Sequence, residues 1–370
     1  MCGRYGGEEE RETDPLRPSL QSDPACRHGS RGKKNEGSHE DGDRGQERCR
    51  QENGDPDQGG SRAHRTGQST PRRGRAGGVR AVARSTSGLR CSMHELDYLH
   101  GEVDLSSAAA VAAYDELPLW SAMFGLLLLE HVPLAGIRVA LDVGCGTGFP
   151  LIELADRLGP SAHVHGVDPW SAVLARAGDK IAARRTPNVT LHEAYGAAMP
   201  FADQTFDLIV SNVGLNNFDD APAVMRECRR VAREGATLAL TTNLQGHMSE
   251  LYDVLRDVLT DAGEDAALQR LGDHIAHRAT VDGTRALFER GGFNVTRVLE
   301  RSACMRFASG TALLNHYFIR LGFLPAWKSI AAGSEVATFS RLQERLDLFA
   351  RDSGGLSLTI PLAYLEATAA

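Results

Sequence analysis

Apolar runs and amphipathic stretches alternate along the chain from about residue 139 onward. Val139–Val143 is a nearly continuous aliphatic run, which is typical of a parallel strand covered on both faces. Leu151, Leu154 and Leu158 then recur at three- and four-residue spacing. This spacing predicts a helix with one buried face, and the Gly-Pro pair that follows ends it.

The same alternation repeats to the end of the chain. Further strands are expected at 164–167, 189–193, 206–210, 235–243, 291–307 and 356–369. Helices are expected at 171–185, 221–232, 248–262, 265–277, 281–290, 310–320, 324–331 and 335–351. Strands that are apolar throughout and alternate with helices predict an α/β fold with a doubly wound, mostly parallel sheet. The last two strands are expected to form an antiparallel pair at the edge of this sheet.

The expected organisation is a disordered tail followed by one domain. Its parts are the tail (1–92) and a domain at 93–370 made of a helical cap (93–135), a core (136–307), inserted helices (309–353) and a last strand (356–369). Helices inserted at the top of a sheet often form a lid over a site. The lid aromatics are Tyr317, Phe318, Phe323 and Trp327, which supply either an apolar lining or an ordinary core.

The tail contains few large apolar residues and is rich in Gly, Arg, Ser and charge. Such a segment cannot offset its chain entropy by burial, so it is predicted to be disordered. Its last third is basic, whereas the whole chain has a formal net charge of −7, so the folded remainder is acidic. A nucleic-acid arm, a transit-like segment and a translation start at Met93 are the alternatives. Functionless disorder or the internal start is preferred, and a chain beginning at Met93 is expected to fold and bind its ligand.

The cysteines indicate the redox compartment of the protein, and the apolar runs indicate whether it could span a membrane. The seven cysteines show no spacing typical of a metal site or a disulfide framework, which favours a reduced, cytoplasmic setting and no bound metal. The longest apolar run, FGLLLLEHV, is interrupted by Glu130 and His131 and is too short to span a membrane.

A glycine-spaced turn follows the first strand directly. Gly144, Gly146 and Gly148 permit positive φ and close approach of a ligand, while Cys145 between them supplies the small side chain that packing requires. The third glycine arrives one residue earlier than in dinucleotide-binding loops. Asp142 just before the loop would repel a pyrophosphate but could attract the ammonium of an amino-acid moiety, such as that of S-adenosylmethionine.

This acid-x-G-x-G-x-G stretch resembles the first motif of class I S-adenosylmethionine-dependent methyltransferases. The later stretch PFADQTFDLIVSN resembles a conserved region of the ubiquinone- and menaquinone-biosynthesis type of these enzymes, so that the resemblance covers about residues 139–243. It implies a Rossmann-like, seven-stranded sheet and S-adenosylmethionine as cofactor. It also implies that Tyr114, ahead of the first strand, lies beside the methyl group, and that the adenine is bound near Tyr195 and Gly196. The family commonly has an acid at the position of Tyr195, so Glu193 or the backbone could make that contact instead.

The remaining cofactor candidates follow the ends of later strands. Asp168 lies about twenty residues beyond the glycine loop, where a carboxylate commonly accepts the ribose hydroxyls. Pro169 and Trp170 come next, and Trp170 could lie against the adenine. Asn212 and Val213 follow the fourth strand, and ligands of parallel sheets bind at such carboxyl ends. Either Asn212 or the nearby Asn216 could instead cap the next helix.

The sequence therefore predicts a methyltransferase that acts on a small, possibly lipophilic, molecule. Transfer of a methyl group from a sulfonium needs alignment and exclusion of water, with a base only when the acceptor must lose a proton. Candidate bases are His131, His247 and His316. The alternatives are a non-catalytic S-adenosylmethionine-binding protein, an NAD-dependent oxidoreductase and, disfavoured by the acidic domain, a nucleic-acid methyltransferase.

Overall fold

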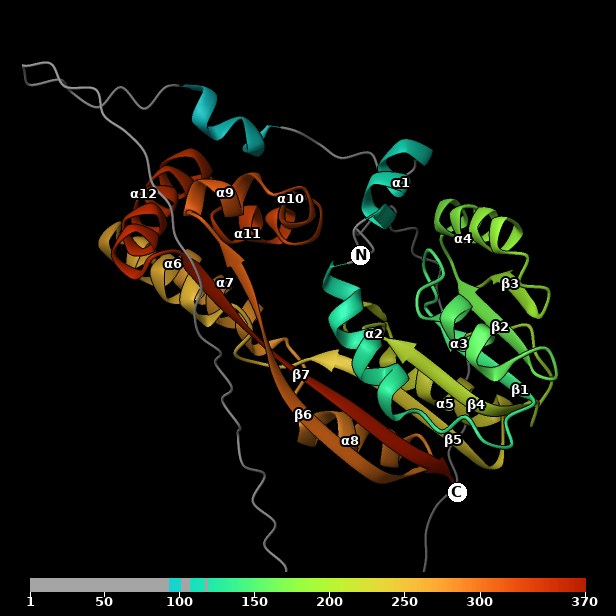
Figure 1. Cartoon of the computed structure of the whole chain (residues 1–370). Coiled ribbons are helices and arrows are strands. Elements are labelled where there is room, and N and C mark those ends of the chain that lie inside the picture. Colours follow the sequence, from blue (N-terminus) through green and yellow to red (C-terminus); the bar gives the residue numbers. More distant parts are fainter. Residues whose placement is uncertain (1–92, 101–106, 117–118) are drawn as a thin grey trace, which may run out of the picture. The chain divides into compact units, whose positions relative to one another are not determined.

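The computed structural model describes residues 93–100, 107–116 and 119–370, so the predicted disorder of residues 1–92 falls outside the described residues. Within them lies one seven-stranded sheet of order β3-β2-β1-β4-β5-β7-β6 (Figure 1). Its strands are β1 (Val139–Val143), β2 (His163–Asp168), β3 (Val189–Glu193), β4 (Phe206–Asn212), β5 (Ala232–Asn243), β6 (Phe293–Phe307) and β7 (Leu356–Ala369). The predicted α/β sheet is confirmed.

The parallel part of the sheet is centred on β1, which pairs with β2 on one side and with β4 on the other. β7 runs antiparallel to both of its neighbours, β5 and β6. The expected antiparallel pair is therefore present, and the last strand of the chain enters the sheet between β5 and β6. Because β1 is central and covered on both faces, its side chains are almost entirely buried.

Helices cover both faces of the sheet, as expected of a doubly wound fold. The helices of the described residues are η1 (Met93–Leu99), α1 (Ala108–Glu116), α2 (Leu119–His131), α3 (Leu151–Leu158), α4 (Ser171–Arg184), η2 (Leu215–Asn217), α5 (Ala221–Val231), α6 (Ser249–Asp261), α7 (Asp265–Ala276), α8 (Val281–Arg290), α9 (Gly310–Asn315), α10 (Tyr317–Gly322), α11 (Leu324–Ile330) and α12 (Glu335–Ser353). α2 and α3 share one apolar core with the sheet, which contains Phe124 and Leu154. α5 and α8 share the other, which contains Val224 and Phe288.

The inserted helices α9 to α12 pack together with α6 and α7 beyond the β6 and β7 ends of the sheet (Figure 1). Trp327 of α11 is fully buried there, and its indole N–H donates to the Tyr252 hydroxyl of α6 at 3.2 Å. The sequence predicted one helix at 310–320, but the extended backbone of His316 (ψ 129°) divides it into α9 and α10. The Asn315 amide donates to the Thr311 carbonyl and so satisfies an acceptor at the end of α9.

Across the described ranges, no helix combines the length and the apolar character that crossing a bilayer requires.

Candidate active site

A cavity of about 460 Å³ lies at the carboxyl ends of the parallel strands, within the size range of small-molecule sites. Strand ends form its floor, and α1, α2 and α10 contribute side chains from above. Most of the predicted cofactor residues line it, namely Tyr114, Gly144, Gly146, Asp168, Pro169, Trp170, Tyr195, Gly196, Asn212 and Val213. Asp142 of β1 and Cys145 and Gly148 of the glycine loop do not reach the cavity wall.

The glycine loop is tied to the neighbouring strand by its own backbone. The amides of Gly144 and Cys145 both donate to the Val167 carbonyl, at 2.8 and 3.1 Å. Gly148 has a φ of +94°, and a Cβ there would lie 2.9 Å from Ile152 Cδ1, so only glycine fits. Gly146 also has a positive φ, but a Cβ on it would meet no protein atom within 4 Å. The loop therefore packs against α3 at its third glycine and faces open space at its second.

Asp168 joins the end of β2 to this loop. One carboxylate oxygen accepts from the Gly146 amide and the other from the Trp170 amide, each at 3.0 Å. Burial raises the pKa of Asp168, and these two hydrogen bonds offset part of the rise. The acid predicted to bind ribose thus lies on the cavity wall, held in place by backbone donors.

Asp142 is fully buried in β1, and its oxygens have no hydrogen-bond partner of normal geometry. Burial, followed by the negative charge of Asp168, raises its pKa to about 8, and the Leu151 backbone amide offsets only part of this. The carboxyl group is therefore neutral at pH 7 in this fold. The Asp142 carboxyl lies behind the loop. It does not reach the cavity wall, where the contact with an ammonium group was predicted.

Cys145 is also buried beneath the loop. Burial, and then the negative charge of Asp142, raises the pKa of its thiol well above the usual range. A thiol in this state is a poor nucleophile, which agrees with the packing role expected from the sequence.

Tyr114 lines the cavity from α1, and the neighbouring Asp115 fixes this helix to α4. Asp115 accepts from Arg176 Nε at 2.8 Å and from Lys180 Nζ at 2.5 Å, and only 6% of its side chain is exposed. Burial acts to raise the pKa of Asp115, but its hydrogen bonds with Lys180, Thr147 and Arg176 lower it overall. Burial, then the charges of Asp168 and Asp115, raises the pKa of Tyr114, so its phenol stays protonated.

Tyr195 and Gly196 lie on the loop after β3 and line the cavity, whereas Glu193 does not. Tyr195 is 66% exposed. A Cβ on Gly196 would lie 3.0 Å from Val143 Cγ1, so this loop passes close over the end of β1. Of the alternatives for the adenine contact, Tyr195 and the backbone at Gly196 line the cavity, and Glu193 does not.

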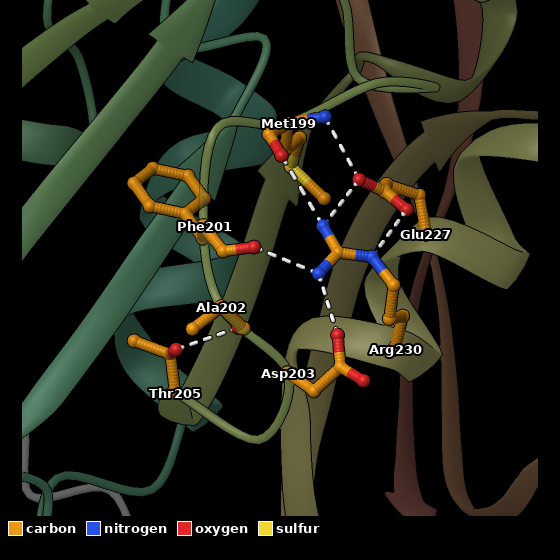
Figure 2. Close-up of polar contacts among 7 residues, drawn as sticks. All are labelled: Met199, Phe201, Ala202, Asp203, Thr205, Glu227 and Arg230. Carbon is orange, nitrogen blue, oxygen red and sulfur yellow. Dashed lines mark hydrogen bonds and ion pairs between the residues drawn. The ribbon is translucent and has the colours of Figure 1, made fainter.

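Arg230 of α5 holds the rest of that loop, as Figure 2 shows. Its guanidinium donates to the carbonyls of Met199 and Phe201 and to the carboxylates of Asp203 and Glu227. Glu227 also accepts from the Met199 amide at 2.8 Å. No motif in the sequence predicts this network, because its members meet only when α5 packs beside the loop.

Asn212 and Asn216 are both held by other protein groups. Asn212 donates to the Ser121 carbonyl of α2 at 3.1 Å and accepts from the Thr241 hydroxyl at 2.7 Å. Asn216 donates to the Thr242 hydroxyl at 2.8 Å and to Asn243 Oδ1. Neither side chain caps a helix. Instead they fix α2 and the loop after β4 to the end of β5.

Three aromatic side chains form an apolar wall, which we call the aromatic wall: Trp120, Phe318 and Phe323. All three line the cavity. The Trp120 ring stacks on Phe318 at 5.8 Å and meets Phe323 edge-on at 5.2 Å. Of the other predicted lid aromatics, Trp327 is buried among helices and Tyr317 lies outside the cavity, where its hydroxyl donates to the Ala110 carbonyl.

None of the three candidate histidines lines the cavity. His131 lies at the surface beside Arg301 and Glu130. His247 is buried, and burial lowers its pKa to about 3. Within the described residues, the site therefore holds no histidine positioned to act as a base.

Comparison with known proteins gives a match at the same part of the chain. Residues 140–235 match a family model described as a methyltransferase domain. A demethylmenaquinone methyltransferase of Anoxybacillus flavithermus is 40% identical over 96 residues, which cover 26% of this chain and 40% of that protein. A malonyl-[acyl-carrier protein] O-methyltransferase of Halorhodospira halophila is 31% identical over 168 residues, 45% of this chain and 54% of that protein.

Among solved structures, a SAM dependent methyltransferase from Aquifex aeolicus is similar with a TM-score of 0.41 and 19% identity, over 52% of this chain and 92% of that one. The chain thus spans about two fifths to about half of the two curated relatives named above. The matched segment contains most of β1, the glycine loop and Asp168. This segment is therefore similar to a methyltransferase domain, and the motifs from which the sequence predicted such an enzyme lie within it.

Proposed function

We propose that the protein is an S-adenosylmethionine-dependent methyltransferase that acts on a small-molecule acceptor. The observation that carries this proposal is the contact between the Asp168 carboxylate and the Gly146 amide, which brings the acid predicted to bind ribose and the glycine loop together at one cavity. A cytoplasmic location is part of the proposal. It is supported by the free state of Cys145, Cys228 and Cys304 among the described residues.

The residues of the cavity suit a nucleoside that carries an amino-acid end. Asp168 presents a carboxylate for ribose hydroxyls, and Trp170 and Tyr195 offer aromatic faces for a base. The open space beside Gly146 allows close backbone approach. A cation on the other side of the loop from the buried carboxyl of Asp142 would lower the pKa of that carboxyl and favour its ionised form.

The cofactor, when bound, supplies a methyl group on a positively charged sulfur. The chain's own residues hold and orient the reactants and exclude water, because methyl transfer is an in-line displacement that depends on alignment. The aromatic wall of Trp120, Phe318 and Phe323 provides the apolar enclosure. The protonated Tyr114 phenol is a hydrogen-bond donor at the same cavity.

Calorimetry with S-adenosylhomocysteine tests the cofactor, and incubation of the full chain with labelled S-adenosylmethionine and metabolite extracts tests the reaction. We expect micromolar or tighter binding of S-adenosylhomocysteine, no comparable binding of NADH, and label transferred to a small molecule. Tight NADH binding in place of S-adenosylhomocysteine would refute the proposal. Cofactor binding without transfer to any extract would favour the non-catalytic alternative.

A further inference from the structure

Arg278 is a cationic residue that lines the cavity. It follows α7, and it lines both the main cavity and a smaller neighbouring one. Its position is set by the sheet: Leu244 forms a parallel bridge with Ala279, and the Gln245 amide donates to the Ala279 carbonyl at 2.9 Å. The segment that carries Arg278 is therefore anchored beside the end of β5.

No carboxylate of the described chain forms an ion pair with Arg278. Its Nε is buried without a hydrogen-bond partner. Asp219 lines both cavities and Asp220 lines the main one, and neither is an ion-pair partner of Arg278 among the described residues. Arg230, by contrast, is paired with two carboxylates. The Arg278 side chain interacts with the Tyr252 hydroxyl, which carries no charge. A partly buried cation without a counter-charge is costly, so Arg278 is complementary to an anion.

The groups behind Arg278 are neutral. The Tyr252 hydroxyl lies 3.0 Å from His274 Nε2 and 3.4 Å from His247 Nε2, and it accepts from the Trp327 indole. Burial, and then the positive charge of Arg278, lowers the pKa of His247 to about 3 and that of His274 to about 4. Arg278 is thus the charged member of this cluster.

This cluster adjoins the aromatic wall, because the Phe323 ring lies 6.0 Å from His247 and 5.7 Å from Trp327. A molecule in this part of the cavity therefore meets an apolar surface and a cation together. Arginine is well suited to carboxylate and phosphate groups, which accept two parallel hydrogen bonds from its planar fork.

We propose that Arg278 binds an anionic group of the methyl acceptor, a carboxylate or a phosphate, while the aromatic wall takes the apolar part. This inference rests on the proposed function, since it assigns Arg278 to the acceptor rather than to the cofactor. It defines the substrate class as small amphiphilic anions.

The test uses the full chain and three phenyl probes: benzoate, phenyl phosphate and benzyl alcohol. Affinity is measured by calorimetry at fixed saturating S-adenosylhomocysteine for wild type, Arg278→Met, Arg278→Lys and, as a matched control, Arg290→Met on the exposed end of α8. Wild type is expected to bind one of the anions about tenfold or more tightly than benzyl alcohol. Whichever anion binds more tightly distinguishes the carboxylate from the phosphate.

The Arg278→Met variant should lose this preference, Arg278→Lys should retain part of it, and Arg290→Met should behave as wild type. Equal binding of benzyl alcohol by wild type, or a preserved anion preference in Arg278→Met, would overturn the inference. A parallel fall in S-adenosylhomocysteine affinity would also overturn it, because Arg278 would then serve the cofactor. If wild type does not bind S-adenosylhomocysteine, the proposed function fails. In that case the preference for anions, and its dependence on Arg278, are measured in the absence of S-adenosylhomocysteine. These measurements still decide the inference.

Discussion

The two halves of the cavity are built in different ways. The half that we propose binds the cofactor, called the cofactor half, contains Gly144, Gly146 and Asp168, which directly follow or end adjacent parallel strands. Backbone amides of the glycine loop donate the hydrogen bonds that join these strand ends. The acceptor half contains Trp120 and Phe323, which are far apart in the sequence and meet through their rings at 5.2 Å. The first is a local motif placed by strand pairing, whereas the second exists only when distant helices pack together.

This difference implies that the halves can be altered separately. Changes at the strand ends should act on cofactor affinity and on the stability of the sheet. Changes in the aromatic wall should act on the acceptor, because its residues share no hydrogen bond with the glycine loop within the described residues.

The largest effect is expected from Asp142→Asn. The pKa of Asp142 is raised to about 8 in the fold, whereas an unfolded aspartate titrates near about 3.9. Between these pH values the folded chain holds a proton that the unfolded chain has released. The free energy of unfolding therefore falls as pH rises through this window, by up to about 1.4 kcal/mol per pH unit.

Asparagine does not titrate, so Asp142→Asn should gain stability relative to wild type from pH 5 to pH 8 in urea unfolding. Exposed Asp179→Asn is the control and should follow wild type. If the unfolding free energies of wild type and Asp142→Asn changed with pH in the same way, the buried carboxyl would not be protonated.

An ammonium near the loop would also lower the pKa of Asp142. Binding of S-adenosylhomocysteine at pH 7 should therefore release a proton, which calorimetry in two buffers measures.

Asp168→Ala should weaken cofactor binding by about 1.5 to 3 kcal/mol, the scale of hydrogen bonds to a charged group. The variant loses the proposed acceptor for ribose and also the carboxylate oxygens that accept from the Gly146 and Trp170 amides. Calorimetry with S-adenosylhomocysteine measures the loss, with Asp179→Ala as the control. Unchanged affinity would remove Asp168 from the cofactor site.

Arg230→Met should lower the free energy of unfolding by about 1 to 2 kcal/mol, because it leaves Glu227 and two loop carbonyls without their donor. The loop carries Tyr195 and Gly196, so S-adenosylhomocysteine affinity should fall a few-fold. Arg226→Met on the exposed side of α5 is the matched control. A loss of stability with full cofactor affinity would mean that the loop keeps its position without Arg230.

Phe318→Ala should produce the smallest change, roughly a three- to tenfold loss of methyl transfer, on the scale of one aromatic contact. Affinity for S-adenosylhomocysteine should change by less than about twofold. Tyr317→Phe serves as the control, because Tyr317 lies outside the cavity although it too was predicted to line the lid. Equal losses of transfer and cofactor affinity in Phe318→Ala would show that the two halves are not separable.

The sequence by itself determined the strands, the parallel sheet and most of the cofactor half. These features have local signals: apolar runs of strand length, glycines at fixed spacing, and an acid at the end of the second strand. Because parallel strands align their carboxyl ends, the motifs that follow them meet at one edge without further information.

Only the tertiary structure decided the acceptor half and the state of Asp142. The acceptor half is lined by Trp120, Arg278 and Phe323, because separate helices and a loop converge on the cavity. No periodicity within a single segment predicts this arrangement. Asp142 is indistinguishable in sequence from a carboxylate that faces a ligand. Its burial follows from β1 lying between two paired strands with helices on both faces, which removes water from the carboxyl and raises its pKa.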